Sequence, residues 1–225
     1  VVNGIASASV TLGVGLQPTG EATGTGAGAN GPTGDAGDNL VMDFGFTPTF
    51  SVGNRVFADN GAGGGGANNG VQDGTEPGIA GVVVKLFAAD GSGNPTGTVL
   101  ATETTDGDGW YRFDGLLTGT YVVVVDVANS PNLSGLVSST GASSDTTLTG
   151  DLKDHGKDAP VSIDTVVSGI ASTPVTLGVG LQPTGEATGT GAGVNGPTGD
   201  AGDNLVMDFG FQAPAGPLDF GDAPT

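Results

Sequence analysis

Short runs of β-branched and aromatic residues alternate along the chain with clusters of glycine, asparagine, aspartate and proline. Runs of this kind, bounded by turn-forming residues, are typical of β-strands. A helix would lose about 1 kcal/mol at each interior glycine and about 3 kcal/mol at each proline. The pattern therefore predicts an all-β chain, with strands at 51–58, 79–89, 98–105, 110–113, 120–127, 160–167, 173–179 and 204–211.

Alternation within these strands assigns side chains to faces, because neighbouring side chains on a strand point to opposite sides of its sheet. In 79–89, Val84 and the residues two positions away from it face one side. Lys85 faces the other side. We therefore expect Val84 to lie in the core and Lys85 to be exposed.

The same alternation places Tyr111 inward and Trp110 outward. An isolated exposed aromatic is normal on a protein surface. Trp110 is nevertheless expected to share an apolar outer face with Val122 and Val124. A shared face of this kind favours Trp110 as an anchor at a contact between subunits or domains.

An internal repeat organises the chain. Residues 1–46 align without gaps to residues 166–211 at an offset of 165, and 42 of the 46 positions are identical. This period predicts one complete repeat at 47–211, preceded by the C-terminal half of another at 1–46 and followed by a linker and the start of a further module at 212–225. Short strands joined by turns within one such period predict one Ig-like β-sandwich per repeat.

Half a β-sandwich cannot bury its own apolar face, and it leaves strand edges unpaired. The segment 1–46 therefore predicts a partner that supplies the missing strands. Two sources remain open. One is a neighbouring copy of the protein, which would add its strands in a fibre, and the other is an upstream half of the same polypeptide.

Composition and charge narrow the choice of partners. The chain has 5 lysine and arginine residues against 24 aspartate and glutamate residues, a net charge of −19, which disfavours nucleic acid and anionic lipid and favours cations. The absence of cysteine excludes a disulfide framework and thiolate metal sites. No long apolar run and no leader segment is recognised, so we expect neither membrane insertion nor a retained signal peptide. Export to the cell surface is inferred from the composition.

Three stretches carry a family resemblance. Residues 52–59 read VGNRVFAD, residues 69–82 read NGVQDGTEPGIAGV, and residues 105–116 read TDGDGWYRFDGL. In this order they resemble the B-type repeat of the serine-aspartate repeat adhesins, a calcium-binding relative of the collagen-adhesin B domain. The resemblance implies a prealbumin-like or Ig-like sandwich that serves as an extracellular stalk or spacer.

Residues 69–76 fit the second half of a twelve-residue calcium loop. In this register Gly70 forms the bend, and Val71 supplies its carbonyl oxygen. The side-chain ligands are Asn69, Asp73 and Glu76. The first two ligand positions fall on residues without a side-chain oxygen. Asp59 and Asn60 can replace them only if residues 61–67 loop out.

Two further acidic groups are candidate calcium ligands. Asp106 and Asp108 lie in one turn, where the resembled family places carboxylates near the same ion. A third group is crowded into one connection, where a cation would relieve mutual repulsion, and consists of Asp145, Asp151, Asp154 and Asp158. Turn chemistry is the alternative throughout, because aspartate and asparagine initiate turns without metal.

Other motifs are assigned no chemistry. Residues 26–31 and 191–196 match G-x-G-x-x-G, but a proline follows each and no helix begins there, so both are interpreted as loops. LQPTG at 181–185 resembles a scrambled sortase signal and is expected to anchor nothing. The only histidine, His155, is expected to be a solvated loop residue. Relatives of this fold often carry a lysine–asparagine cross-link, which is not expected here because an exposed Lys85 is a poor nucleophile.

The sequence therefore predicts a structural repeat of an extracellular stalk, adhesin or filament, stiffened by Ca²⁺ and in contact with neighbouring copies of the same protein. One histidine, no cysteine and no recognisable pair of catalytic carboxylates disfavour an enzyme. Two other functions remain open. One is a ligand-binding adhesin whose exposed loop at 180–203 holds a surface polymer, and the other is an accessory module of a secreted enzyme.

Overall fold

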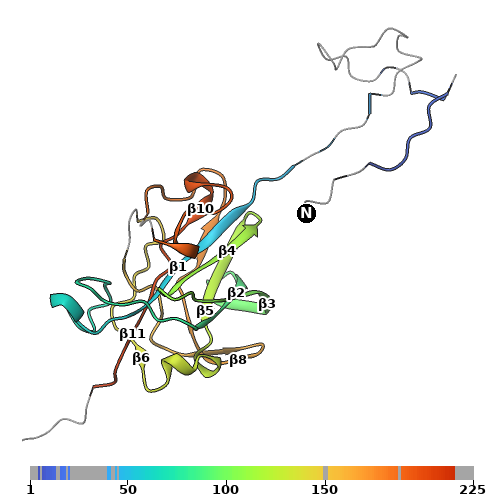
Figure 1. Cartoon of the computed structure of the whole chain (residues 1–225). Helices are drawn as coiled ribbons and strands as arrows, with labels where there is room; N and C mark the ends of the chain where they lie inside the picture. Colours follow the sequence, from blue (N-terminus) through green and yellow to red (C-terminus); the bar gives the residue numbers. More distant parts are fainter. Residues whose placement is uncertain are drawn as a thin grey trace, which may run out of the picture. The chain divides into compact units, whose positions relative to one another are not determined.

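The computed structural model describes residues 46–148, 152–186 and 189–215, together with Ile5, 7–13, 16–18, Gly20, 40–41 and Phe44. The chain divides into two units, residues 1–47 and 48–225. The described residues form strands and short 3₁₀ turns but no α-helix, and they confirm the prediction of an all-β sandwich (Figure 1). Helices of the length and apolarity that a membrane crossing requires are absent from this part of the chain.

The second unit contains eleven described strands. Their bounds are β1 Phe50–Ala58, β2 Val83–Ala89, β3 Pro95–Thr104, β4 Trp110–Leu116, β5 Gly119–Val125, β6 Val137–Ser138, β7 Val161–Ile163, β8 Val166–Ala171, β9 Val175–Leu177, β10 Asp203–Asn204 and β11 Phe209–Gln212. The 3₁₀ turns are η3 Ala62–Gly64, η4 Val127–Asn129, η5 Pro131–Leu133, η6 Gly191–Gly193 and η7 Asp200–Gly202.

The first sheet is built around β1, which is paired along both edges. β4 lies antiparallel along one edge. β10 and then β11 lie parallel along the other, with Val52 opposite Asn204 and Val56 opposite Phe209. Because the first and last strands run in the same direction, the chain enters the repeat at one end of the sandwich and leaves it at the opposite end (Figure 1).

The second sheet has the order β3-β2-β5-β8-β7, and β9 also pairs with β5. The core lies between the sheets and includes the inward side chains that alternation predicted, such as Val84 and Tyr111. Tyr111 packs edge-on against Phe113, with ring centroids 6.0 Å apart. The face assignment of these strands is therefore confirmed.

A smaller apolar cluster lies on the outer side of the second sheet. It consists of Phe87, Val122, Val124, Val166 and Ala171. The predicted strand at 160–167 is wrong, because the chain reverses at Asp164, which has a left-handed φ of 49°. The resulting β7–β8 hairpin contributes to the cover of this cluster. Val122 and Val124 belong to β5 and not to the sheet of Trp110, so the predicted shared apolar surface does not exist.

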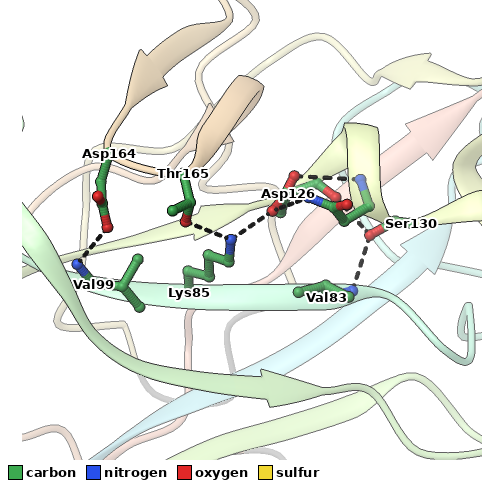
Figure 2. Close-up of polar contacts among 8 residues, drawn as sticks. Val83, Lys85, Val99, Asp126, Ser130, Asp164 and Thr165 are labelled. Carbon is green, nitrogen blue, oxygen red and sulfur yellow. Dashed lines mark hydrogen bonds and ion pairs between the residues drawn. The ribbon is translucent and has the colours of Figure 1, made fainter.

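The prediction that Lys85 is exposed is also wrong. Its side chain is 11% exposed, and its Nζ lies 2.8 Å from Oδ2 of the fully buried Asp126. Figure 2 shows that Nζ also reaches Thr165 at the tip of the β7–β8 hairpin, to which it donates a hydrogen bond of 3.0 Å. Lys85 does point away from the core, but the hairpin covers the outer face at this place. Exposure of Lys85 therefore cannot be the reason for expecting no lysine–asparagine cross-link. That no cross-link forms stays a prediction.

Trp110 points outward, as predicted, but its own chain covers it. It is 8% exposed, and the guanidinium of Arg55 lies 4.7 Å from its ring centroid. Gly189 and Gly193 approach the ring so closely that a methyl group on either would overlap it. Gly193, in the motif at 191–196, therefore serves close packing against an aromatic ring, which agrees with the loop interpretation.

The strand predicted at 204–211 is interrupted. β10 ends at Asn204, and β11 begins at Phe209. The intervening residues Leu205, Val206 and Met207 are all buried, so their apolar run reflects burial without strand pairing. Periodicity alone cannot distinguish these two situations.

The described residues of unit 1–47 differ sharply in exposure from their counterparts 165 positions later. Leu12 and Phe46 are 68% and 77% exposed, whereas Leu177 and Phe211 are 0% and 1% exposed. The side chains are identical, so the difference comes from their surroundings, and the second copy packs against the strands β1–β5. The domain boundaries predicted from the repeat remain a prediction.

Truncation at this repeated position should reveal the difference. Leu177→Ala should lower the free energy of unfolding by about 2–5 kcal/mol, because it empties part of a packed core. Leu12→Ala, the same change at the matched position, should alter it by less than about 0.5 kcal/mol in the monomer. Denaturant unfolding of the full chain measures both. Equal losses would contradict the exposed position of Leu12.

Candidate functional site

The segment after β1 loops out, as the calcium-loop interpretation requires. Residues 61–67 leave the strand, with η3 inside them, and the chain returns to Asp59. One carboxylate oxygen of Asp59 accepts a 3.3 Å hydrogen bond from the amide of Asn69, and the other a 2.8 Å bond from the amide of Gly70. Asp59 therefore stands beside the second half of the loop, although sequence separates it by ten residues.

Two further carboxylates close the loop on itself. Glu76 accepts hydrogen bonds from the amides of Gly61 at 2.8 Å and Asp73 at 3.2 Å. Asp73 accepts them from the amide of Gly66 at 2.9 Å and from the Asn69 side chain at 3.1 Å. The carboxylates thus accept from N–H groups that the glycine-rich backbone leaves accessible.

The bend at Gly70 requires glycine. Its φ is 69°, in the left-handed region, and a side chain would collide with the carbonyl oxygen of Thr140. Beyond the bend, Val71 forms a bridge to Lys153, and the amide of Gln72 donates to the carbonyl of Leu152 at 2.7 Å. The loop is therefore held against the connection that carries the third acidic group.

A cavity of about 500 Å³ lies beside this loop. Its lining includes Asp73, Glu76 and Asp108, and also Arg55. Arg55 Nε donates a 2.8 Å hydrogen bond to the carbonyl oxygen of Asp108. Burial lowers the pKa of Arg55, while neighbouring carboxylates oppose that effect. The structure therefore brings Asp73 and Glu76 of the candidate calcium loop and Asp108 of the second group to the same cavity.

Asp106, the other member of the second group, stabilises its own turn. Its Oδ1 accepts hydrogen bonds of 3.0 Å from the amides of both Asp108 and Trp110. Asp108 instead accepts a hydrogen bond of 3.2 Å from the hydroxyl of Thr190. Turn formation thus accounts for Asp106, while Asp108 alone contributes to the lining of the cavity.

The third group is not gathered in one place. Asp145 caps a local turn by accepting from the amide and hydroxyl of Thr147, and these bonds lower its pKa. Asp158 is exposed and lines a different cavity, of about 260 Å³. Asp151 lies outside the described residues.

Asp154 is fully buried. Its Oδ1 accepts hydrogen bonds from the amides of Gly156 at 2.7 Å and Gly210 at 3.2 Å, which joins the connection to β11. Burial raises the pKa of Asp154 to about 7, against the opposing effect of these bonds. The hydrogen bonds from Gly156 and Gly210 account for the buried position of Asp154.

The prediction of a solvated His155 is wrong. The side chain is 0% exposed, and its ring nitrogens each lie 2.8 Å from a carbonyl oxygen, that of Lys153 for Nδ1 and that of Asp145 for Nε2. The backbone amide of His155 donates to the carbonyl of Asp208. His155 therefore ties the connection together, a role that a lone histidine between polar residues does not reveal.

The oxygen donors of the acidic loop suit a hard cation such as Ca²⁺. Among the described residues, however, no three acidic or histidine side chains converge closely enough to hold a metal. Their oxygens are directed at backbone amides. A cation at the loop would hence need these side chains to turn from the amides toward a common point.

Sequence reasoning missed the acidic side chains around β10, among them Glu186 and Asp203. Both are buried. The spacing of Asp200, Asp203 and Asn204 was the available signal, but turn residues of this kind are frequent throughout the chain.

Asp154 predicts a pH dependence of stability. Because its pKa is about 7 when folded and about 3.9 in an unfolded chain, the folded state retains the proton over a wider range. Its contribution is fully present below about pH 4 and is lost as the pH rises to about 7, on the order of a few kcal/mol. Asp154→Asn should remove this loss and be more stable than the unchanged protein at pH 8.

The difference in unfolding free energy between the two proteins, measured from pH 4.5 to pH 8, isolates this effect from the other carboxylates. A difference that does not vary with pH would contradict the assignment.

Comparison with known proteins places these features in a family. The SdrD B-like domain model matches residues 50–181. Serine-aspartate repeat-containing protein D of Staphylococcus aureus (strain Newman) is 37% identical over 146 residues, 63% of this chain and 10% of that protein.

Two further relatives match over a shorter segment. Serine-aspartate repeat-containing protein I of Staphylococcus saprophyticus is 46% identical over 88 residues, which are 38% of this chain and 4% of that protein. Protein F of Staphylococcus epidermidis (strain ATCC 12228 / FDA PCI 1200) is 42% identical over 88 residues, 38% of this chain and 5% of that protein. The chain thus spans a tenth or less of the length of these relatives. Since the family match covers more than half of it, the chain belongs to the SdrD B-like domain family.

Proposed function

We propose that this chain is a force-bearing segment of an extracellular bacterial stalk, adhesin or filament, in which the repeats act as spacers. Membership of the SdrD B-like family and the serine-aspartate repeat relatives support a structural role at a cell surface. The carrying observation is the parallel pairing of β1 with β10 and β11. A repeat that the chain enters and leaves at opposite ends adds its full length to an array.

The same pairing determines how tension would act. Force along the chain pulls the start of β1 and the end of β11 apart. Since these strands run in the same direction, the force loads their hydrogen bonds together in shear. Strands that are peeled apart break their bonds one at a time, which needs less force.

We further propose that Ca²⁺ stiffens the repeat at the loop 59–76. Asp59, Asp73 and Glu76 would be its carboxylate ligands, with Asn69 and the carbonyl of Val71, and Asp108 lines the adjoining cavity. Calcium takes about six to eight oxygen ligands in flexible geometry. When bound, the ion would supply positive charge that offsets the carboxylates of Asp59, Asp73 and Glu76.

The half-repeat 1–46 is proposed to be completed by the first half of a neighbouring repeat. The exposed Leu12 and Phe46, whose counterparts are buried, support this. A second copy of the protein and an upstream segment of the same polypeptide both satisfy the requirement. Either one makes neighbouring repeats of this protein the partners.

A ligand-binding adhesin and an accessory module of an enzyme are the alternative functions. The cavity beside Arg55 and Trp110 is the feature that would suit a ligand. Arg55 and the glycine-rich segment cover the indole faces, however, so the ring is poorly placed to stack on a bound sugar. The spacer function is therefore favoured.

Pulling geometry tests the force-bearing role. The chain has no cysteine, so pairs of engineered cysteines give unique handles in the full chain. Handles at residues 49 and 213 load β1 and β11 in shear, and handles at residues 49 and 117 peel the antiparallel β4 from β1. The rupture force in single-molecule stretching should be severalfold higher for the first pair. Similar forces for both pairs would refute the proposal.

Calcium removal tests the loop. Saturating Ca²⁺ at about 100 times its dissociation constant adds about 2.7 kcal/mol, which for a chain of this size raises the melting temperature by roughly 5–10 °C. The rise should become smaller in Glu76→Gln. Glu103→Gln, the same change at an exposed residue of β3, is the matched control and should behave as the unchanged protein. Melting curves that EDTA and Ca²⁺ leave identical would eliminate calcium.

A further inference from the structure

The C-terminal half of the repeat, residues 166–211, joins the sandwich along two strands, β1 and β5. β10 and β11 lie beside β1, and β8 and β9 lie beside β5. Side chains of this half, among them Leu177 and Phe211, complete the core between the sheets. We therefore call β1 and β5 the acceptor strands.

The chain contains this half twice, since residues 1–46 match residues 166–211 at 42 of 46 positions. Each apolar residue that is buried in the described part of 166–211 has an identical residue 165 positions earlier. In the described part of 1–46 these side chains are exposed, as at Ile5 and Phe44. Two segments with the same core side chains therefore compete for one pair of acceptor strands.

Three of the four differing positions do not weaken the fit of residues 1–46. Ser168 has a left-handed φ of 55°, which asparagine, its counterpart at position 3, adopts more readily. The hydroxyl of Thr173 is buried without a hydrogen-bond partner, and the counterpart Ala8 has no hydroxyl. Val194 is 45% exposed, so alanine in its place leaves the core unchanged.

Only the fourth position favours residues 166–211. The ring of Pro174 lies so close to Gly93 that a methyl group on this glycine would overlap it. Ser9, the counterpart of Pro174, would lose this contact. The two halves therefore fit the acceptor strands about equally well.

The parallel pairing of β1 and β11 prevents residues 1–46 from taking this position in their own chain. Phe211 lies opposite Ala58, at the end of β1. Phe46 in its place would be about 26 Å from Phe50, which lies eight residues back along the strand. The four residue steps from Phe46 to Phe50 span at most about 14 Å. The acceptor strands must therefore belong to another molecule.

We propose that residues 1–46 of one molecule replace residues 166–211 on the acceptor strands of a second molecule. This inference rests on the proposed completion of the half-repeat by a neighbouring repeat, and it identifies a second copy as the partner. The entering chain begins its own β1 four residues after Phe46, so exchange joins two repeats in sequence. The resident half is linked to its acceptor strands, which is equivalent to an effective concentration of about millimolar. Exchange therefore increases with protein concentration.

Disulfide trapping in the full chain tests the exchange, because the protein has no cysteine of its own. Thr176 lies opposite Thr120 on β5, with the two hydroxyl oxygens 3.1 Å apart, and both residues are exposed. Thr11 is the counterpart of Thr176. In a variant with Thr11→Cys and Thr120→Cys, mild oxidation should therefore link molecules into dimers and longer multimers.

Two matched pairs control for geometry and for random collision. Thr120→Cys with Thr176→Cys should form a disulfide within one molecule. Thr11→Cys with Thr102→Cys moves the second cysteine to an exposed position on β3, where exchange brings no partner, and should give few multimers.

Weakening one half at a time should shift the exchange in opposite directions. Leu177→Ala weakens the resident half and should raise the yield of linked multimers about tenfold. Leu12→Ala weakens the entering half and should lower the yield by a similar factor. If Leu177→Ala does not fold, the variant with Thr11→Cys and Thr120→Cys can be refolded from denaturant at about millimolar concentration. Both halves then compete without a core substitution, and the same multimers should form.

Three results would overturn the proposal. Equal multimer yields with Thr102→Cys and with Thr120→Cys would indicate random collision. A disulfide within one molecule between positions 11 and 120 would mean that a chain completes itself. If no disulfide forms, residues 1–46 do not enter the acceptor strands of a second copy. Completion by an upstream segment then remains, and the proposed spacer function stands without this inference.

Discussion

The parallel hydrogen bonds between β1 and the two C-terminal strands hold the first and last segments of the repeat together. β1 also supplies Val52 and Val56 to the core. It ends directly before Asp59, so it determines where the acidic loop begins. The amide of Gly210 in β11 donates a hydrogen bond to Asp154, which joins β11 to the connection that carries this residue. The core, the acidic loop and the direction in which the chain leaves the repeat all depend on this one pairing.

Backbone N–H groups stabilise the buried carboxylates of this repeat by donating hydrogen bonds to them, as cations often do in other proteins. The chain has a net charge of −19, yet Asp59, Glu76 and Asp154 are buried. Each receives at least two N–H donors from the backbone. Glycine-rich segments suit this arrangement because no side chain shields their amides. Glu186 Oε2 departs from it, since its oxygen lacks a donor.

The candidate site could be predicted in part. The register of 69–76 correctly required residues 61–67 to loop out if Asp59 was to approach, and the structure has this geometry. The sequence could not show that Asp108 joins the cavity while Asp106 stabilises its own turn, because both have the same turn-forming chemistry. The grouping of Asp145, Asp154 and Asp158 was misleading, because closeness along the chain does not imply that side chains converge.

Local patterns by themselves determined the all-β class and the inward positions of residues such as Val84 and Tyr111, and alignment of the sequence with itself determined the repeat of 165 residues. The inward positions follow from the two-residue period of a strand, which the sequence of that strand alone displays. Only the tertiary structure decided whether an outward side chain meets solvent. Lys85 and Trp110 are covered by segments far from them in sequence, and the ring of His155 is held by carbonyl groups of its own connection. Burial on an outer face depends on which loop folds over it, and such contacts leave no periodic trace in the sequence.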